Sequence, residues 1–169
     1  MRNKNSQKRP AANTSWNKVA PQYDRLVSKG GSDYHQNIII PKLIELISPQ
    51  KGEKILDIAC GQGVLCRTLA ERGCLVTGID AAPKLIDYAK KYPGSKEAIN
   101  YLVRDARKLE GIPDAAFDQA ICVLAIQNID IVDTAFSEIS RVLKKTGHFT
   151  LVMNHPCFRI PRQTGWGID

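Results

Sequence analysis

The sequence lacks any apolar run long enough to span a bilayer, and its first residues lack the apolar segment of a signal peptide. We therefore expect no membrane segment and a cytoplasmic location. Cysteine is also sparse: the five cysteines are odd in number and never occur as Cys-x-x-Cys. This spacing argues against a disulfide framework and against a zinc site, so we expect reduced thiols and no metal.

Acidic residues are absent from the first 18 residues, which carry five of the seven net positive charges. A polar, basic stretch of this kind predicts a disordered tail over residues 1–12. The rest of the chain carries 19 basic and 17 acidic side chains with no evident basic stripe, so nucleic acid is not an expected partner. Residues 13–169 have the length and the apolar content of a single domain.

The most informative stretch runs from Lys54 to Leu65. An apolar run that predicts a strand carries Asp57 near its end, passes through Gly61 and Gly63, and enters a helical pattern at Val64. Glycine permits a tight turn and close contact with a ligand, and the first amides of a helix attract an anionic group. A nucleotide-like ligand is the natural candidate.

Two other nucleotide-binding patterns lack residues that they need. The dinucleotide fingerprint has a third glycine where this chain has Cys66, and the phosphate loop ends in Gly-Lys-Ser/Thr. A glycine turn between a strand and a helix is by itself weak evidence, since ordinary connections contain it too.

Strand and helix patterns alternate through the chain, which predicts parallel βαβ units in an open α/β sheet. The expected strands are 55–59, 75–79, 99–103, 117–123 and 148–153, and the expected helices lie at 16–26, 33–48, 64–69, 82–91 and 134–144. Pro21 is expected to break or kink the first helix, and Asp133 to cap the last one.

The segment Asp57-Ile-Ala-Cys-Gly-Gln-Gly63 resembles the first motif of class I S-adenosylmethionine (SAM)-dependent methyltransferases of the small-molecule type, similar to methyltransferase domains 11 and 25. The resemblance runs from about Asp33 to Met153, with Ala59 where many members carry glycine. It implies a Rossmann-like, mainly parallel sheet with flanking helices and SAM as cofactor, with S-adenosylhomocysteine as product.

The family's sheet has seven strands, whereas this chain reaches five before Asp169. We therefore expect residues 13–169 to be a SAM-binding domain that is incomplete at its C-terminus. The edge of the fifth strand would be open. A missing segment, a partner chain or a truncated variant would each account for this, and we favour a fragment.

The resemblance assigns cofactor contacts to the ends of the strands. Asp80 would accept hydrogen bonds from the ribose hydroxyls, and Asp105 from the adenine amino group. The expected cofactor-binding residues are Asp57, Ala59, Cys60, Gly61, Gly63, Asp80, Ala81, Asp105, Ala106, Cys122 and Gln127. Alternatively, Asp80 only caps the helix that begins at Ala82, and Asp105 is a solvated loop residue.

Substrate contacts are less clearly marked. Tyr23 resembles a lid residue that lies over the cofactor, and Arg159 and Trp166 follow the fifth strand on the side where substrate would enter. Gln127 and His155 are candidates for catalysis, although no partner for either is identifiable. The alternative is that Tyr23 and the C-terminal loop only pack. The Asp/Asn-Pro-Pro-Tyr/Phe sequence of amino-methylating DNA enzymes is absent.

These features predict transfer of a methyl group from SAM to an oxygen, nitrogen or carbon atom of a small molecule. Methyl transfer disperses the sulfonium charge, so positioning supplies most of the catalysis, and the lack of an obvious catalytic dyad is expected. The alternatives are a module that binds SAM or a partner without catalysis, and an NAD-dependent oxidoreductase.

Overall fold

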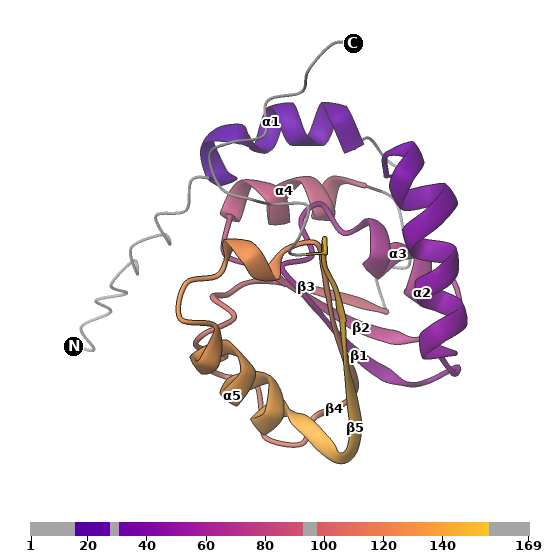
Figure 1. Ribbon diagram of the computed structural model, residues 1–169, viewed down its shortest axis with the longest axis vertical. Coiled ribbons are helices and arrows are strands. Elements are labelled where there is room, and N and C mark those ends of the chain that lie inside the picture. The colour runs from indigo at the N-terminus through magenta and orange to yellow at the C-terminus, as the bar shows by residue number, and fades with distance from the viewer. Residues whose placement is uncertain (1–15, 28–30, 93–97, 156–169) are drawn as a thin grey trace, which may run out of the picture.

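The centre of the molecule is a five-stranded sheet in which all neighbouring strands are parallel (Figure 1). The computed structural model describes residues 16–27, 31–92 and 98–155. The strands are β1 (Lys54–Ile58), β2 (Leu75–Asp80), β3 (Ile99–Val103), β4 (Phe117–Val123) and β5 (Leu143–Val152). Their order is β3-β2-β1-β4-β5, so the winding reverses between β1 and β4, where sheets of this kind bind ligands. The predicted parallel α/β sheet is confirmed.

Helices cover both faces of this sheet. They are α1 (Trp16–Val27), the π-helical turn η1 (His35–Ile39), α2 (Ile40–Ile47), α3 (Val64–Ala70), α4 (Pro83–Lys91), the 3-10 turn η2 (Ile126–Asn128) and α5 (Val132–Val142). On one face Ile139 of α5 belongs to a core with Leu56. On the other, Leu43 of α2 and Leu69 of α3 belong to a core with Ile55. Because neighbouring residues of β1 point to opposite faces, this strand is buried on both sides.

The first helices differ from the predicted ones around their prolines. Pro21 lies inside α1, which continues to Val27, so of the predicted break or kink the break does not occur. Ahead of Pro41 the chain makes a π turn, in which Ile40 N–H donates to His35 O. Since proline has no N–H and clashes with the preceding turn of a regular α-helix, the wider turn lets the helix pass Pro41.

The boundary between α5 and β5 was also predicted incorrectly. The helix ends at Val142 and the strand starts at Leu143, earlier than its pattern suggested. The register moves from Phe117–Leu143 to Gln119–His148, so β5 carries extra residues between these pairs. The N-cap of α5 is Ile131, with a left-handed backbone, and the predicted cap Asp133 lies in the first turn instead.

Within the described residues, β5 pairs only with β4 and forms one edge of the sheet. This agrees with the five strands expected from the sequence. The predicted tail over residues 1–12 and the loop beyond residue 155 lie outside the described residues. None of the helices in the described ranges combines the length and the apolarity that a membrane span requires.

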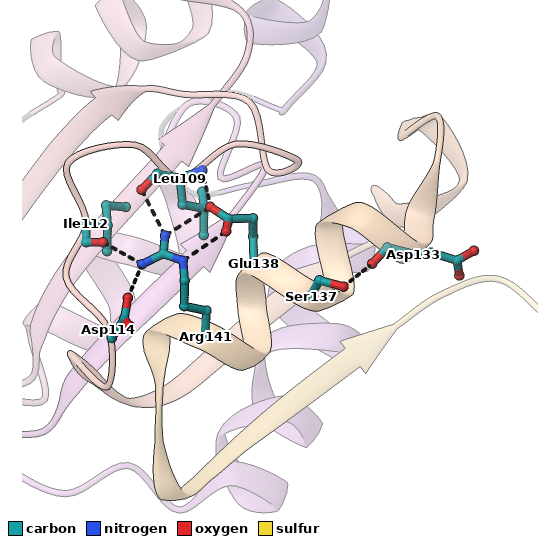
Figure 2. A network of polar contacts seen from close by, with 7 residues as sticks. All are labelled: Leu109, Ile112, Asp114, Asp133, Ser137, Glu138 and Arg141. Carbon is teal, nitrogen blue, oxygen red and sulfur yellow. Dashed lines mark hydrogen bonds and ion pairs between the residues drawn. The ribbon is translucent and has the colours of Figure 1, made fainter.

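An ion-pair network attaches the long loop after β3 to α5 (Figure 2). The Arg141 guanidinium donates to both carboxylate oxygens of Glu138 at 2.9 Å and to Asp114 at 2.6 Å. It also donates to the carbonyls of Ile112 and Leu109 at 3.0 and 3.2 Å, and Glu138 accepts from the Leu109 amide at 2.7 Å. Backbone groups of a loop without helix or strand thereby gain partners.

The chain leaves β1 through a strained turn, residues 59–63, which we call the glycine turn. Three of its residues have a left-handed backbone: Ala59 (φ +55°), Gly61 (φ +56°) and Gly63 (φ +78°). The conformation is readily adopted by glycine and disfavoured for alanine, because its Cβ approaches the following carbonyl. Ala59 therefore stores strain beside Asp57.

Replacing Arg141 with lysine keeps the charge but removes the planar fork that contacts both carboxylates and both carbonyls. We expect the free energy of unfolding to fall by about 2 kcal/mol, because buried carbonyls of the loop lose their donor. Urea denaturation measures the change. Arg72, exposed and bonded to Thr68 O, provides the matched control, since Arg72→Lys should cost less than about 0.5 kcal/mol. Equal losses in the two variants would contradict this role.

Replacing Ala59 with glycine should stabilise the protein. Relief of the left-handed strain outweighs the extra backbone entropy of glycine, and we expect the free energy of unfolding to rise by about 0.5–1 kcal/mol. The control is Ala89→Gly, at a buried position inside α4, where the change should destabilise by a similar amount. A loss of stability in both variants would show that Ala59 is not strained.

Candidate cofactor site

The glycine turn is attached to the neighbouring strand, so its shape depends on the sheet. Cys60 N–H donates to Ile79 O of β2 at 2.9 Å, and Gly63 N–H donates back to Cys60 O at 2.9 Å. The turn thus lies at the carboxyl ends of β1 and β2, beside the switch between β1 and β4. This is the position in which the sequence placed it.

Two glycines give α3 room to pack on the sheet. A Cβ at Gly63 would lie 2.3 Å from the Tyr101 hydroxyl, and one at Gly78 would lie 2.7 Å from Cys66 Sγ and 3.0 Å from Cys60 Sγ. Any side chain at either position would displace its neighbours. In dinucleotide-binding proteins a third glycine on the helix lets helix and strand pack closely. Here the helix carries Cys66 at that position, and Gly78 of β2 provides the space instead.

Asp80 connects the turns that follow β1 and β2. Its Oδ2 accepts from Gly61 N–H at 2.9 Å and its Oδ1 from Ala82 N–H at 2.8 Å. The carboxylate is 8% exposed, and burial raises its pKa while the two amides oppose that increase. The bond to Ala82 is the capping contact that the sequence allowed as an alternative. Each oxygen keeps a second acceptor direction, so capping and hydroxyl binding are compatible.

Asp57 is buried next to thiols. Its Oδ2 accepts from the Cys66 thiol at 3.0 Å. Burial raises the pKa of Asp57 to about 7, although the hydrogen bond from Cys66 opposes the increase and the charge of Asp80 adds to it. Burial also raises the pKa of Cys60 to about 11 and that of Cys66 further, so both remain thiols at neutral pH. The four cysteines in the described part of the chain are free, as expected.

Tyr23 lies over the glycine turn. A Cβ at Gly61 would lie 3.5 Å from Tyr23 Cε1. Burial raises the pKa of the Tyr23 phenol, and the carboxylates of Asp80 and Asp57 raise it further, so the hydroxyl stays protonated and able to donate. Trp16 packs edge-on against the Tyr23 ring.

A cavity of about 50 Å³ lies between Tyr23 and the sheet. This space holds only a few water molecules, and its lining includes neither Asp80 nor Asp105, so it lies at the expected methionine end of the site and not at the nucleoside end. The lining residues come from α1, η1, α2, the glycine turn, the start of α3 and the end of β4: Tyr23, Val27, His35, Ile39, Ile40, Leu43, Asp57, Ala59, Cys60, Gln62, Val64, Leu65 and Val123.

His35, whose position in the sequence allows a contact with cofactor or substrate but more often indicates a structural role, is a member of this lining. Ser32 Oγ hydrogen-bonds its Nδ1 at 2.8 Å, and burial lowers the pKa of the imidazole, which favours the neutral ring. A single histidine in an amphipathic segment is more often structural, so only its position facing the cavity distinguishes it. The helix turn that carries it is far from Asp57 in sequence, which is why spacing gave no signal.

Asp105 follows β3 and is less available than the sequence suggested. Its carboxylate accepts from Arg107 Nη2 at 2.6 Å, from Nε at 3.0 and 3.1 Å, and from the Arg107 amide at 2.9 Å. These bonds lower its pKa. Arg104 N–H donates to Asp80 O at 3.0 Å, so this loop begins beside the end of β2. Ala106 is buried in the core.

The remaining predicted site residues divide between the site and the surface. Cys122 is buried in β4, and Ala81 is half-buried between Asp80 and α4. Gln127 lies in η2, exposed, and its Nε2 donates to Leu124 O at 2.8 Å. His155 is exposed beyond β5. Arg159 and Trp166 lie outside the described residues. No cluster of three or more metal-ligating side chains occurs among the residues that the structure describes.

Comparison with known sequences connects this geometry to a family. Residues 56–151 match the methyltransferase domain family. YqeM of Bacillus subtilis, named as a methyltransferase, is 36% identical over 146 residues, covering 83% of this chain and 56% of YqeM. A demethylmenaquinone methyltransferase of Tropheryma whipplei is 29% identical over 144 residues, covering 83% of this chain and 58% of that protein. The chain spans a little over half the length of these relatives.

Solved structures agree. A SAM-dependent methyltransferase from Mesorhizobium loti superposes with a TM-score of 0.68 at 31% identity, covering 76% of this chain and 59% of that one. The PH0226 protein of Pyrococcus horikoshii gives the same TM-score and identity, with 83% and 62% covered. With the parallel sheet, the glycine turn and the buried Asp80, these matches show that the chain belongs to the class I SAM-dependent methyltransferases.

Proposed function

We propose that this chain is the SAM-binding part of a cytoplasmic methyltransferase that transfers a methyl group to an oxygen, nitrogen or carbon atom of a small molecule. The observation that carries the proposal is the buried Asp80 carboxylate, held by amides on both sides at the end of β2. A buried carboxylate with unused acceptor directions suits the paired hydroxyls of a ribose.

The other residues fit the rest of the cofactor. The methionine part would lie along the glycine turn, with Asp57 near its ammonium group and Tyr23 over it. Asp80 and Ala81 would hold the ribose. Asp105 would reach the adenine amino group only by sharing its carboxylate with Arg107. Because Tyr23 lies against Gly61, entry of the cofactor also requires Tyr23 and α1 to move outward before they close over it.

When bound, SAM supplies a methyl group on a positively charged sulfur. Apart from a proton that some acceptors must lose, the protein's task is to align donor and acceptor and to exclude water. Tyr23, which lies over the glycine turn, supports that role. Cys122 and Gln127 lie toward the end of β4, where the acceptor would meet the methyl. For an acceptor that must lose a proton, the candidate bases are His35, which lines the cavity, and His155, which is exposed beyond β5.

The names of several relatives support a small-molecule acceptor. They include demethylmenaquinone methyltransferases and a ubiquinone biosynthesis O-methyltransferase, although another is a malonyl-[acyl-carrier protein] O-methyltransferase. We infer an acceptor of the quinol or phenol type as the first to test. Among the described residues β5 pairs only with β4. This favours one alternative, a module that pairs through this edge with a further segment or partner chain and binds without turnover.

Calorimetric titration with SAM, S-adenosylhomocysteine and NAD tests the cofactor assignment. We expect saturable binding of the first two and none of NAD. Methyl transfer to small quinols and phenols then separates an enzyme from a binding module. Binding of NAD alone by the folded chain would overturn the proposal.

Asp80→Asn should weaken binding of SAM, S-adenosylhomocysteine and adenosine by about 10- to 100-fold, because an amide loses the charge that strengthens hydrogen bonds from ribose. Adenosine isolates the ribose contribution. Asp118→Asn is the matched control, since Asp118 likewise accepts from a backbone amide, that of Lys54, but lies at the opposite end of the sheet. Unchanged adenosine affinity in Asp80→Asn would rule out the ribose role.

Affinity for SAM should rise with pH. Since the pKa of Asp57 is about 7 in the protein without ligand, its carboxyl is mostly protonated at pH 6 and mostly ionised at pH 7.5. A cationic ligand favours the ionised form, so the association constant should rise by about eightfold over this interval. Titrations at both pH values measure it. In Asp57→Asn the dependence should disappear, and an equal slope in that variant would assign it to another group.

A further inference from the structure

Helix α1 is held to α4 at two points. Near its start, Asn17 Oδ1 accepts from the Lys84 amide at 3.2 Å. Near its end, Asp24 Oδ1 accepts from the Tyr92 hydroxyl at 2.9 Å. Between them Ala20 is fully buried in a small core with α4. Figure 1 shows α1 lying along α4 above the sheet. These contacts, together with Tyr23 over the glycine turn and Val27 beside η1 and α2, hold α1 in place.

The contact at Tyr92 continues to the glycine turn. The guanidinium carbon of Arg67 lies 4.8 Å from the centroid of the Tyr92 ring. Arg67 Nη1 donates to the carbonyl of Gln62 at 2.7 Å, and the Arg67 side chain is nearly completely buried. A cation over an aromatic ring gains more when it is removed from water, so this stack is favourable here. The chain of contacts runs from Asp24 through Tyr92 and Arg67 to the turn.

Asp24 directly follows Tyr23, the residue that lies over Gly61. One side chain of α1 thus covers the glycine turn, and the next is connected to the carbonyl inside the same turn. Movement of α1 away from the site must separate Asp24 from Tyr92. A hydrogen bond from a hydroxyl to a carboxylate is stronger than one between neutral groups, so this separation is costly.

We propose that Asp24, Tyr92 and Arg67 form a latch that holds α1 closed over the glycine turn and controls the exchange of cofactor. Tyr23 lies against Gly61 in this conformation, so a ligand reaches the glycine turn only when α1 opens. When α1 closes again over the bound ligand the latch re-forms, and release requires the same opening. The latch is a positioning device and takes no part in methyl transfer. That the exchanged ligand is SAM rests on the proposed function, whereas the contacts that hold α1 do not.

The test uses Tyr92→Phe, which removes one hydroxyl and keeps the ring under Arg67. A latch that gates both directions predicts that the association and dissociation rates of S-adenosylhomocysteine both rise, by about tenfold, equal to about 1.4 kcal/mol. The dissociation constant should change by less than about threefold. A merely structural role predicts weaker binding without faster association.

Stopped-flow fluorescence measures both rates on the full chain. Trp16 lies on α1 and packs against Tyr23, so it reports the position of this helix. Trp166 is the other tryptophan of the sequence, and Trp166→Phe in every sample leaves Trp16 as the sole reporter. Calorimetry on chains that retain Trp166 checks that the dissociation constants agree.

The chain offers a matched control on the same helix. Tyr88 lies one turn before Tyr92 and packs in the core beneath α1, and none of the described hydrogen bonds involves its hydroxyl. Tyr88→Phe should leave both rates unchanged. Asp24→Asn keeps an acceptor for Tyr92 and should raise the rates less than Asp24→Ala. Combining Asp24→Ala with Tyr92→Phe should add little, because both remove the same bond.

Hydrogen exchange without ligand separates the latch from the cofactor assignment. In Tyr92→Phe the amides of α1 should exchange about tenfold faster while those of β1 are unchanged. If the unaltered chain binds no nucleoside, the proposed function fails, and faster exchange in α1 still supports the latch. Unchanged exchange and unchanged rates in Tyr92→Phe would overturn the latch, whatever ligand the site binds.

Discussion

The carboxylate of Asp80 joins the two turns on which the candidate site depends. One oxygen fixes the glycine turn after β1 through Gly61, and the other fixes the start of α4 through Ala82. Because α4 in turn carries α1, the same carboxylate determines where Tyr23 can lie. A buried charge is expensive unless it is hydrogen-bonded, so the protein maintains both amide contacts and the geometry that they impose.

The space left by a glycine is as important to this site as its polar side chains. Gly78 leaves room for the thiols of Cys60 and Cys66, and through Cys66 for the hydrogen bond that reaches Asp57. Ala59, which directly follows β1, has a left-handed backbone. Strain at Ala59 and burial at Asp57 are both tolerated because β1 is packed on its two faces and cannot relax.

The sequence predicted what local periodicity and motif spacing control. The five strands, the turn after Asp57 and the carboxylate at Asp80 belong to this group. Contacts between distant segments could not be predicted from local patterns. The place of His35 in the cavity lining and the network around Arg141 depend on how the helices pack. The apolar positions of α5 suit a helix reaching residue 144, but pairing of Leu143 with Phe117 ends it earlier.

The partners of α1 on α4 are 67 and 68 residues further along the chain. On the ribosome α1 is synthesised first, yet its docking surface does not exist until the segment through Tyr92 has emerged. Non-local contacts form late because the intervening chain must be ordered first. The cover of the candidate site therefore docks only after the chain has been made through Tyr92, and until then a nascent chain exposes the glycine turn.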